Sequence, residues 1–253
     1  MLSFTSKLSP DAEALAIFVN DKYVYKDRIH ILPDAMVKQI DSFIGVLRAR
    51  KKKEDISFLD ISEKQKCFII KVKNQYESYW PQENGGTFFT YLKKLQDIKK
   101  VDLYLDSLDF DKGKLVNFFS QFIFGFDLKS YSFNKYKTLN KEKIEQKIDF
   151  KIVTKNKEII EKKYKYYDAI KEGVFLSRDL VSEPPNVLNP KNYVKEIQKL
   201  SKLGLKIKAY NEKELKKLGL NALLGVGLGS VNETYLVTIE WRGKNNSLKN
   251  PLT

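Results

Sequence analysis

The sequence contains one cysteine and one histidine among its 253 residues. A disulfide needs two thiols, so the single Cys67 excludes an intrachain disulfide and a metal centre made of several thiolates. A reducing compartment fits this composition best. His30 is the one imidazole, and a catalytic centre built on histidine has no other candidate base. Nothing in the sequence supplies a nucleophile and an orienting group for it, so we expect His30 to be structural.

Long hydrophobic runs are also absent. The most apolar stretch, residues 115–126, is interrupted by polar side chains and is shorter than the roughly 20 residues that span a bilayer. The apolar stretch Ala14–Val19 follows acidic residues and lacks the basic leader of a signal peptide. The sequence therefore predicts a soluble, cytoplasmic protein without a membrane partner.

Positive charge is abundant, since 46 Lys and Arg residues face 32 Asp and Glu residues for a formal net charge of +14. Such an excess can attract nucleic acid. Lysine is nevertheless spread along the whole chain beside many Asn, Ile, Phe and Tyr residues, as an AT-rich genome would also produce. The densest cluster, Arg48–Lys53, lies between a predicted helix and a predicted strand, where a solvated loop explains it equally well. We expect nucleic-acid binding to be weak.

The first 155 residues alternate between strand-like and helix-like patterns. Apolar, β-prone runs predict strands at Ala14–Val19, Ile56–Ile61, Cys67–Val72, Val101–Leu105 and Ile148–Val153. Apolar residues at helical spacing predict helices at Pro33–Leu47, Phe88–Leu95 and 115–126, with Gly85-Gly86 as a turn before the second. This order predicts a self-contained α/β domain over residues 1–155.

The pattern changes after Val153. A long helix is predicted from Glu158 to Ser182, and it ends there because Pro184 pushes Glu183 out of helical geometry. Asn189 with Pro190 predicts the start of a further helix. The remaining predictions are a helix end at Gly204, a strand at Leu205–Tyr210, a capping box formed by Asn211 and Glu214, and a strand at Tyr235–Trp241. Residues 156–253 are predicted to form a linker helix and a second α/β unit.

Two further motifs invite a functional interpretation. The glycine-rich run Gly225–Ser230 could suggest a phosphate-binding loop, but such a loop follows a strand and opens a helix, whereas this run follows a short helix and precedes a strand. We predict a structural glycine turn. Arg178 and Asp179 with Glu183 could form an acid/base site, although charges at the end of a helix usually form ion pairs and caps.

Several sequence segments in the second half of the chain resemble those of one protein family. The segment Gly173–Asn186, with Pro190 beyond it, closely resembles the segment that opens the peptidase domain of leucyl aminopeptidases, apart from Ser182, where the family usually has Asn. The segments Leu218–Ser230 and Leu236–Gly243 match the same family in order. In the first domain only Gly125–Thr138 is similar to the family. The resemblance implies a macro-domain-like N-terminal domain, a linker helix and the beginning of an α/β peptidase domain.

The resemblance also implies a chemistry. Family members hold two divalent metal ions, Mn or Zn, side by side through Asp and Glu carboxylates and a lysine, so that a bridging water attacks the first peptide bond of a peptide substrate. The family assembles as a homo-hexamer. Neither of the family's metal-binding segments has a counterpart in this sequence. We therefore expect no metal ion in this chain and carry over no catalytic, cofactor-binding or metal residue.

Three functional hypotheses follow from the sequence. The leading one is a portion of a leucyl aminopeptidase that ends before the metal-binding segment and is inactive alone. The second is a basic module, derived from that family, that binds nucleic acid or a protein partner. The third is a chain that assembles with a separately encoded second half.

Overall fold

The computed structural model describes residues 2–27, 30–50, 54–95, 98–138 and 148–241. Its packing divides the chain into two compact units, residues 1–177 and 178–253. Each unit is described by itself. The division falls inside the long helix α5 (Lys157–Ser182), which the sequence predicted within one residue of its observed start. The functional domain boundary expected at residue 155 stays a prediction.

The first unit is built on a six-stranded sheet with the strand order β1-β6-β5-β2-β4-β3. Neighbouring strands run parallel except for β3 and β4, which form an antiparallel hairpin. The strands are β1 (Leu2–Thr5), β2 (Ala14–Val19), β3 (Ile56–Ser62), β4 (Gln65–Lys71), β5 (Lys100–Tyr104) and β6 (Asp149–Val153). The predicted mixed α/β fold class is confirmed, as are all five predicted strands of this unit. The short edge strand β1 was missed, because four residues carry too little periodicity.

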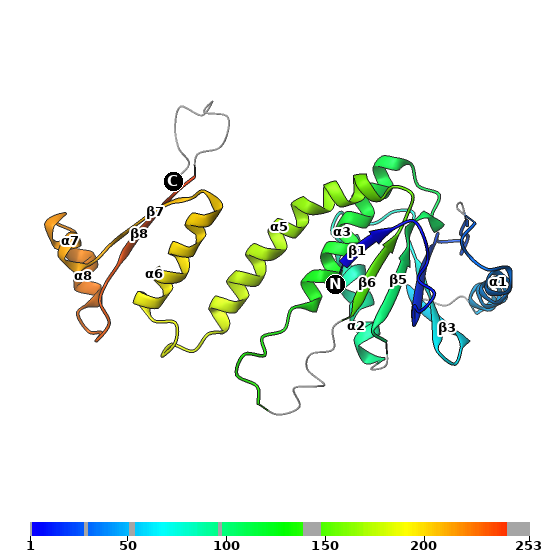
Figure 1. Cartoon of the computed structure of the whole chain (residues 1–253), viewed down its shortest axis with the longest axis horizontal. Coiled ribbons are helices and arrows are strands. Elements are labelled where there is room, and N and C mark those ends of the chain that lie inside the picture. The colour runs from blue at the N-terminus through cyan, green and yellow to red at the C-terminus, as the bar shows by residue number, and fades with distance from the viewer. Residues whose placement is uncertain (1, 28–29, 51–53, 96–97, 139–147, 242–253) are drawn as a thin grey trace. The chain divides into compact units, whose positions relative to one another are not determined.

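Helices cover both faces of this sheet (Figure 1). They are α1 (Asp34–Ala49), α2 (Trp80–Lys94) and α3 (Lys112–Ser130), with the short 3-10 helix η1 (Leu105–Ser107) after β5. Every residue of β2 is buried, and successive side chains enter opposite cores. Leu15 and Ile17 pack in the cluster that contains the buried side of α1. Phe18 packs in the other cluster, with α2, α3 and the first turns of α5. The first unit is therefore a three-layer α/β/α structure.

Helices α2 and α3 approach each other through glycine. A Cβ on Gly85 would lie 1.9 Å from the main-chain oxygen of Phe122, and Gly86 also lies next to α3. The prediction that Gly85-Gly86 is a turn was therefore wrong: both residues lie inside α2, which begins at Trp80 rather than near Phe88. Glycine is a weak helix former, and close packing against the neighbouring helix overrides that local preference.

The buried side chains of α5 lie in its first turns. Ile160 and Tyr164 join the core of the first unit. Ile170 and Val181, further along the helix, are exposed. The first turns of α5 thus complete the sheet domain, and its later turns carry apolar side chains on the surface.

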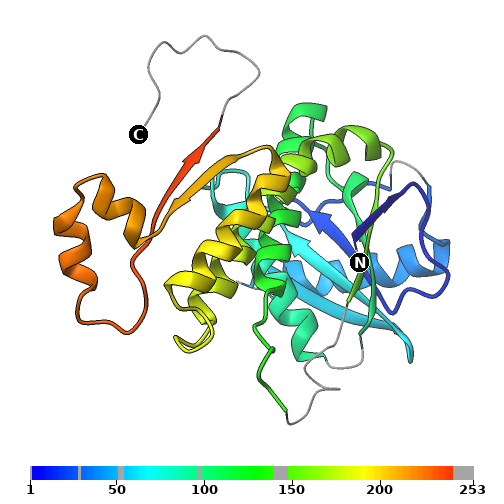
Figure 2. The ribbon, with the colours of Figure 1, turned by 60° about the vertical axis from the view of Figure 1, so that its left-hand side comes forward.

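The second unit contains α6 (Pro190–Lys199), η2 (Leu200–Leu203), β7 (Lys206–Tyr210), α7 (Glu212–Lys217), α8 (Asn221–Gly227) and β8 (Leu236–Glu240). Strands β7 and β8 pair antiparallel, and α7 and α8 lie where β7 ends and β8 begins (Figure 2). Three local predictions are confirmed. Asn189 caps α6, Asn211 and Glu214 form a capping box on α7, and Gly204 follows η2 with a φ of 87°.

Candidate functional site

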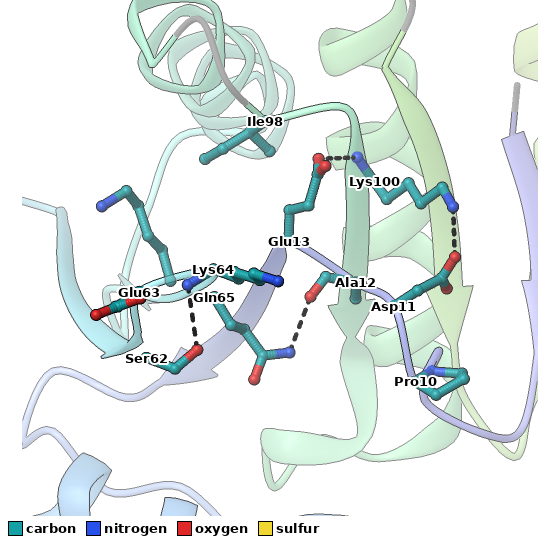
Figure 3. A pocket seen from close by; sticks show the side chains of 11 residues that line it. Pro10, Asp11, Ala12, Glu13, Ser62, Glu63, Lys64, Gln65, Ile98 and Lys100 are labelled. Carbon is teal, nitrogen blue, oxygen red and sulfur yellow. Dashed lines mark hydrogen bonds and ion pairs between the residues drawn. The ribbon is translucent and has the colours of Figure 1, made fainter.

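A hollow of about 740 Å³ opens at the amino ends of β2, β4 and β5 (Figure 3). Its charged side chains are engaged with one another and with the backbone. Glu13 accepts hydrogen bonds from the main-chain N–H groups of Lys99 and Lys100, the latter at 3.0 Å. The Lys100 ammonium forms an ion pair with Asp11. Because both signs of charge alternate around this hollow, it offers no concentrated field for a phosphate or a nucleic acid.

The half-buried Ser9 and the buried Asp102 form a polar pair beside this hollow. The Asp102 carboxylate accepts hydrogen bonds from Ser9 N at 2.5 Å and from Ser9 Oγ at 2.8 Å. Burial raises the pKa of Asp102, and the two hydrogen bonds from Ser9 oppose that shift. The pair fixes the loop before β2 onto β5. A serine bonded to a carboxylate without an intervening imidazole is not a hydrolytic triad.

His30 does not complete such a triad. It lies in the loop that leaves the carboxyl end of β2, and its main-chain N–H donates a hydrogen bond to the main-chain carbonyl of Asp27 at 3.2 Å. Ser9 precedes the amino end of the same strand, so the two side chains occupy opposite ends of the sheet. His30 adopts a φ of 48°, which fits a turn residue. In the described part of the chain, the structure does not bring His30 together with the candidate nucleophile Ser9.

A second hollow, of about 480 Å³, lies at the carboxyl ends of β5 and β6, the edge where open α/β sheets usually bind ligands. The buried Asp106 lies at its base and accepts hydrogen bonds from Thr154 Oγ1 at 3.1 Å and Lys155 N at 2.6 Å. These bonds join the end of β6 to η1. Sequence reasoning missed Asp106 and Asp102, although both are acidic residues that interrupt or directly follow an apolar strand, which is a readable signal.

The three acid/base candidates, Arg178, Asp179 and Glu183, lie where α5 ends. Arg178 and Asp179 lie in the last turns of α5, and the N–H of Glu183 donates to the Asp179 carbonyl at 3.1 Å. The next residues turn sharply, since Leu188 N donates to the Pro184 carbonyl at 2.9 Å. These main-chain bonds assign no acid or base role to the three side chains, and the interpretation of the side chains as ion pairs or caps stays a prediction.

The glycine-rich run is a helix end and not only a turn. Gly225 and Gly227 lie within α8, which corrects the prediction of a glycine turn over the whole run. A Cβ on Gly227 would lie 1.9 Å from Thr234 Oγ1, so glycine here permits the chain to approach the segment that leads into β8. The close contact leaves no room for a phosphate at Gly227.

One residue of the basic cluster Arg48–Lys53 forms hydrogen bonds within the protein. Arg48 donates from Nη2 to the Tyr23 carbonyl at 2.7 Å and from Nε to the Lys22 carbonyl at 3.1 Å, which holds the loop after β2. Lys51, Lys52 and Lys53 lie outside the described residues. Arg48 is therefore a structural residue.

In the described part of the chain, no group of three or more His, Cys, Asp or Glu side chains is placed to hold a metal ion. No helix there combines the length and the apolar character needed to span a membrane.

Comparison with known proteins relates this chain to the cytosol aminopeptidase family. Residues 175–252 match the model of the catalytic domain of the cytosol aminopeptidase family. A probable cytosol aminopeptidase of Phytoplasma mali is 40% identical over 98% of this chain and 50% of its own length. One from Agrobacterium fabrum is 41% identical over 63% of this chain and 32% of its own length. The chain thus spans at most about half the length of these relatives.

Solved structures agree with the fold. A mutant of tomato leucine aminopeptidase superposes with a TM-score of 0.73 over 94% of this chain and 50% of its own, at 18% identity. The bottromycin maturation enzyme in complex with Mn superposes with a TM-score of 0.66 over 92% of this chain and 46% of its own, at 16% identity. At these identities the likeness concerns the fold.

Proposed function

Because the chain belongs to the cytosol aminopeptidase family, we propose that it forms the N-terminal portion of a leucyl aminopeptidase, which removes N-terminal residues from peptides. The observation that carries this proposal is the catalytic-domain match over residues 175–252, within a chain that is 40% identical to a probable cytosol aminopeptidase along 98% of its length. Residues 175–252 therefore correspond to a part of the family's catalytic domain.

The structure supports a division of roles between the two units. The sheet domain has its own core on both faces of the sheet, and its buried acids Asp102 and Asp106 are engaged in hydrogen bonds that fix loops. The second unit carries the family match. We assign peptide-bond chemistry to the peptidase domain that the second unit begins, and a supporting role to the sheet domain.

The residues that the structure describes do not form a site that fits the two metal ions of the proposed enzyme. The described residues contain no cluster of three potential ligands. We propose that the ligands for two divalent metal ions, Mn or Zn, come from the portion of the family sequence that this chain's match does not cover. Such ions would activate a water molecule and stabilise the developing oxyanion when bound. No catalytic step is assigned to a residue of this chain.

Three further properties belong to the same proposal. The 253-residue chain by itself is inactive towards peptides, the complete enzyme is a homo-hexamer, and the protein works in the cytoplasm. The support for these statements is the family membership and the share of the relatives' length that the chain spans.

A chimera tests the proposal. Residues 1–253 would replace the corresponding half of the Phytoplasma mali relative, and release of leucine from a leucine amide would be measured with Mn²⁺. An active chimera is expected, since this chain is 40% identical to the half of the relative that it replaces. A control chimera with residues 178–253 replaced by a flexible linker should be inactive. A folded, metal-loaded chimera without activity would contradict the proposal.

The positive charge favours a second candidate function, a nucleic-acid-binding module. The net charge of +14 supports an electrostatic attraction to phosphates. Against it, the hollow in Figure 3 mixes both signs of charge, and Arg48 is engaged with backbone carbonyls.

A further inference from the structure

The sheet domain has an open hollow at the edge where folds of this class bind ligands. This hollow of about 480 Å³, at the carboxyl ends of β5 and β6, is lined by residues that follow the two strands and by the first turn of α3. Pockets that hold small molecules usually measure roughly 300–1,000 Å³. The hollow lies in the first unit, outside the segment that matches the catalytic domain.

The order of the strands explains the position of the hollow. Strand β2 is followed by α1 on one face of the sheet, whereas the neighbouring β5 is followed by α3 on the other face. Open α/β sheets usually bind ligands at the carboxyl ends of two such strands. Here the loop after β2 is bonded across these ends, since Lys26 N donates to the Ser107 carbonyl at 2.9 Å and the Tyr104 hydroxyl donates to Asp27 at 2.8 Å. The hollow lies on the other side of β5, next to β6.

The side chains that line the hollow give it a positive charge. Lys112 and Lys155 both line it, and Lys112 forms no ion pair in the described part of the chain. The carboxylate in the lining, that of Asp106, accepts hydrogen bonds from Thr154 Oγ1 and Lys155 N. The charge of Asp106 is therefore largely taken up by the residues that follow β6. The hollow in Figure 3 differs, because both signs of charge alternate around it.

Two further carboxylates in the segment between β5 and α3 have partners of their own. Asp109 forms an ion pair with Lys26. Asp111 caps α3, because its carboxylate accepts a hydrogen bond from Lys114 N at 2.9 Å. Neither residue is part of the lining.

Apolar side chains form the rest of the wall. Leu108 and Leu115 are each 3% exposed, and Phe110 is half-buried. The Phe110 ring is held in place, since the Lys114 ammonium lies 4.4 Å from its centroid and the Phe118 ring packs edge to face at 5.5 Å. The hollow is therefore preformed, with basic and apolar side chains in one wall.

We propose that this hollow is a binding site for a small phosphate monoester with an apolar body. Two lysines match the charge of a phosphate monoester, which is about −2 near neutral pH. Lysine binds phosphate as a point charge. The leucine and phenylalanine side chains cover the organic part of the ligand, so a free phosphate ion binds less tightly. This site belongs to the sheet domain and does not depend on the proposed peptidase function.

Titration of the full 253-residue chain with phenyl phosphate tests the site. Isothermal titration calorimetry and phosphorus NMR at low salt follow the binding. Phenyl phosphate should bind more tightly than phenyl sulfate, which has the same shape but a single negative charge. It should also bind more tightly than inorganic phosphate, which lacks the apolar body.

Three variants at exposed lysines locate the site. Lys112→Gln should weaken the binding of phenyl phosphate by about tenfold or more, because hydrogen bonds to charged groups are the stronger ones. Lys112→Arg keeps the charge and should retain most of the affinity. Lys64→Gln is the matched control, since Lys64 is an exposed lysine that lines the hollow of Figure 3 at the amino ends of the strands, and it should leave binding unchanged.

Each result supports or overturns the proposal. Binding that is strongest for phenyl phosphate, weakened in Lys112→Gln and retained in Lys64→Gln and Lys112→Arg would support the site. Phenyl phosphate that fails to bind at millimolar concentration would overturn it, as would equal affinities of the Lys112→Gln and Lys64→Gln variants. Equal binding of phenyl sulfate or of inorganic phosphate would also contradict the assigned ligand class.

Discussion

Gly125 of α3 faces the main-chain carbonyl of Gln82 in α2 so closely that a Cβ at Gly125 would lie 1.9 Å from that oxygen. Gly85 makes the reciprocal approach from α2 to α3. Helices in contact usually lie 8–10 Å apart, and small residues allow the shorter end of that range. The close pair brings Phe88 and Phe122 together over the sheet, with ring centroids 6.2 Å apart.

The first prediction concerns these glycines. Gly125→Ala and Gly85→Ala should each lower the free energy of unfolding by about 1–3 kcal/mol or more, because the added methyl group meets rigid backbone. Gly45→Ala and Gly173→Ala are matched controls in α1 and α5, where nothing lies within 4 Å of the new Cβ. They should stabilise the protein by up to about 1 kcal/mol through helix propensity. Urea unfolding measures the free energy of unfolding of the four variants. Equal changes in the test pair and the control pair would show that α2 and α3 do not approach closely.

The same glycines show what local sequence could and could not predict. Strand positions in the first unit followed from short apolar runs, as at Ala14–Val19, and helix positions followed from apolar residues at helical spacing. Gly85-Gly86 was misread because a helix-weakening pair resembles a turn when its neighbour in space is unknown. The buried acids Asp102 and Asp106 were missed for a similar reason, since their partners Ser9 and Lys155 lie 93 and 49 residues away. Local periodicity does not report such contacts.

The second prediction concerns pH. Asp127 of α3 accepts a hydrogen bond from the Tyr164 hydroxyl of α5. Burial raises the pKa of Asp127 above its ordinary value of 3.8, while the bond from Tyr164 and the charge of Lys171 oppose the shift. A carboxyl with a raised pKa stabilises the fold most below the ordinary pKa, and that stabilisation is lost as pH rises through the raised value.

As the pH rises above about 3.8, the original chain should therefore lose stability through Asp127, and the Asp127→Asn variant should not show this loss. Urea unfolding over a pH series measures the free energy of unfolding of both proteins. Asp11→Asn is the contrasting variant, because the hydrogen bond and charge of Lys100 lower the pKa of Asp11. Its contribution should have the opposite sign and be lost as the pH falls. Parallel pH curves for the Asp127→Asn variant and the original chain would contradict the account.

The third prediction concerns proteolysis. Ile160 and Tyr164 belong to the core of the first unit, so the stable fragment should extend well into α5. Thermolysin should cut first near Val187 and Leu188, in the turn that follows α5, and should leave a resistant fragment that begins at residue 1. A fragment of residues 1–177 should unfold at a higher temperature than one of residues 1–155. Among the described residues 178–241 the buried hydrophobic side chains are those of Val194 and Leu215, so a second unit as resistant as the first would contradict this prediction.

The fourth prediction concerns nucleic acid. Binding that depends on scattered lysines should fall steeply as salt rises, because phosphate contacts release counterions and carry no base readout. Fluorescence anisotropy with labelled duplexes of two unrelated sequences should give similar, weak affinities that vanish near physiological salt. A sequence-specific complex that survives physiological salt would favour the nucleic-acid-binding function over the peptidase proposal.

Family membership could be recognised from sequence because the segment Gly173–Asn186 closely resembles the family's own segment. The apolar residues of the predicted strand Tyr235–Trp241, in contrast, could not be assigned a packing partner. The structure shows the reason in Trp241 and Ile239, which are exposed although their strand was predicted correctly. Alternation in a strand predicts that a face will be covered without saying which element covers it.

The most direct test of the central claim is the hydrolysis of a leucine amide by the purified 253-residue chain, with Mn²⁺, with Zn²⁺ and with a chelator. The proposal that the chain carries one part of a peptidase, with the metal ligands in another, predicts no metal-dependent hydrolysis by this chain and its appearance when the second half of the Phytoplasma mali relative is added. Metal-dependent turnover by the 253-residue chain alone would contradict the account.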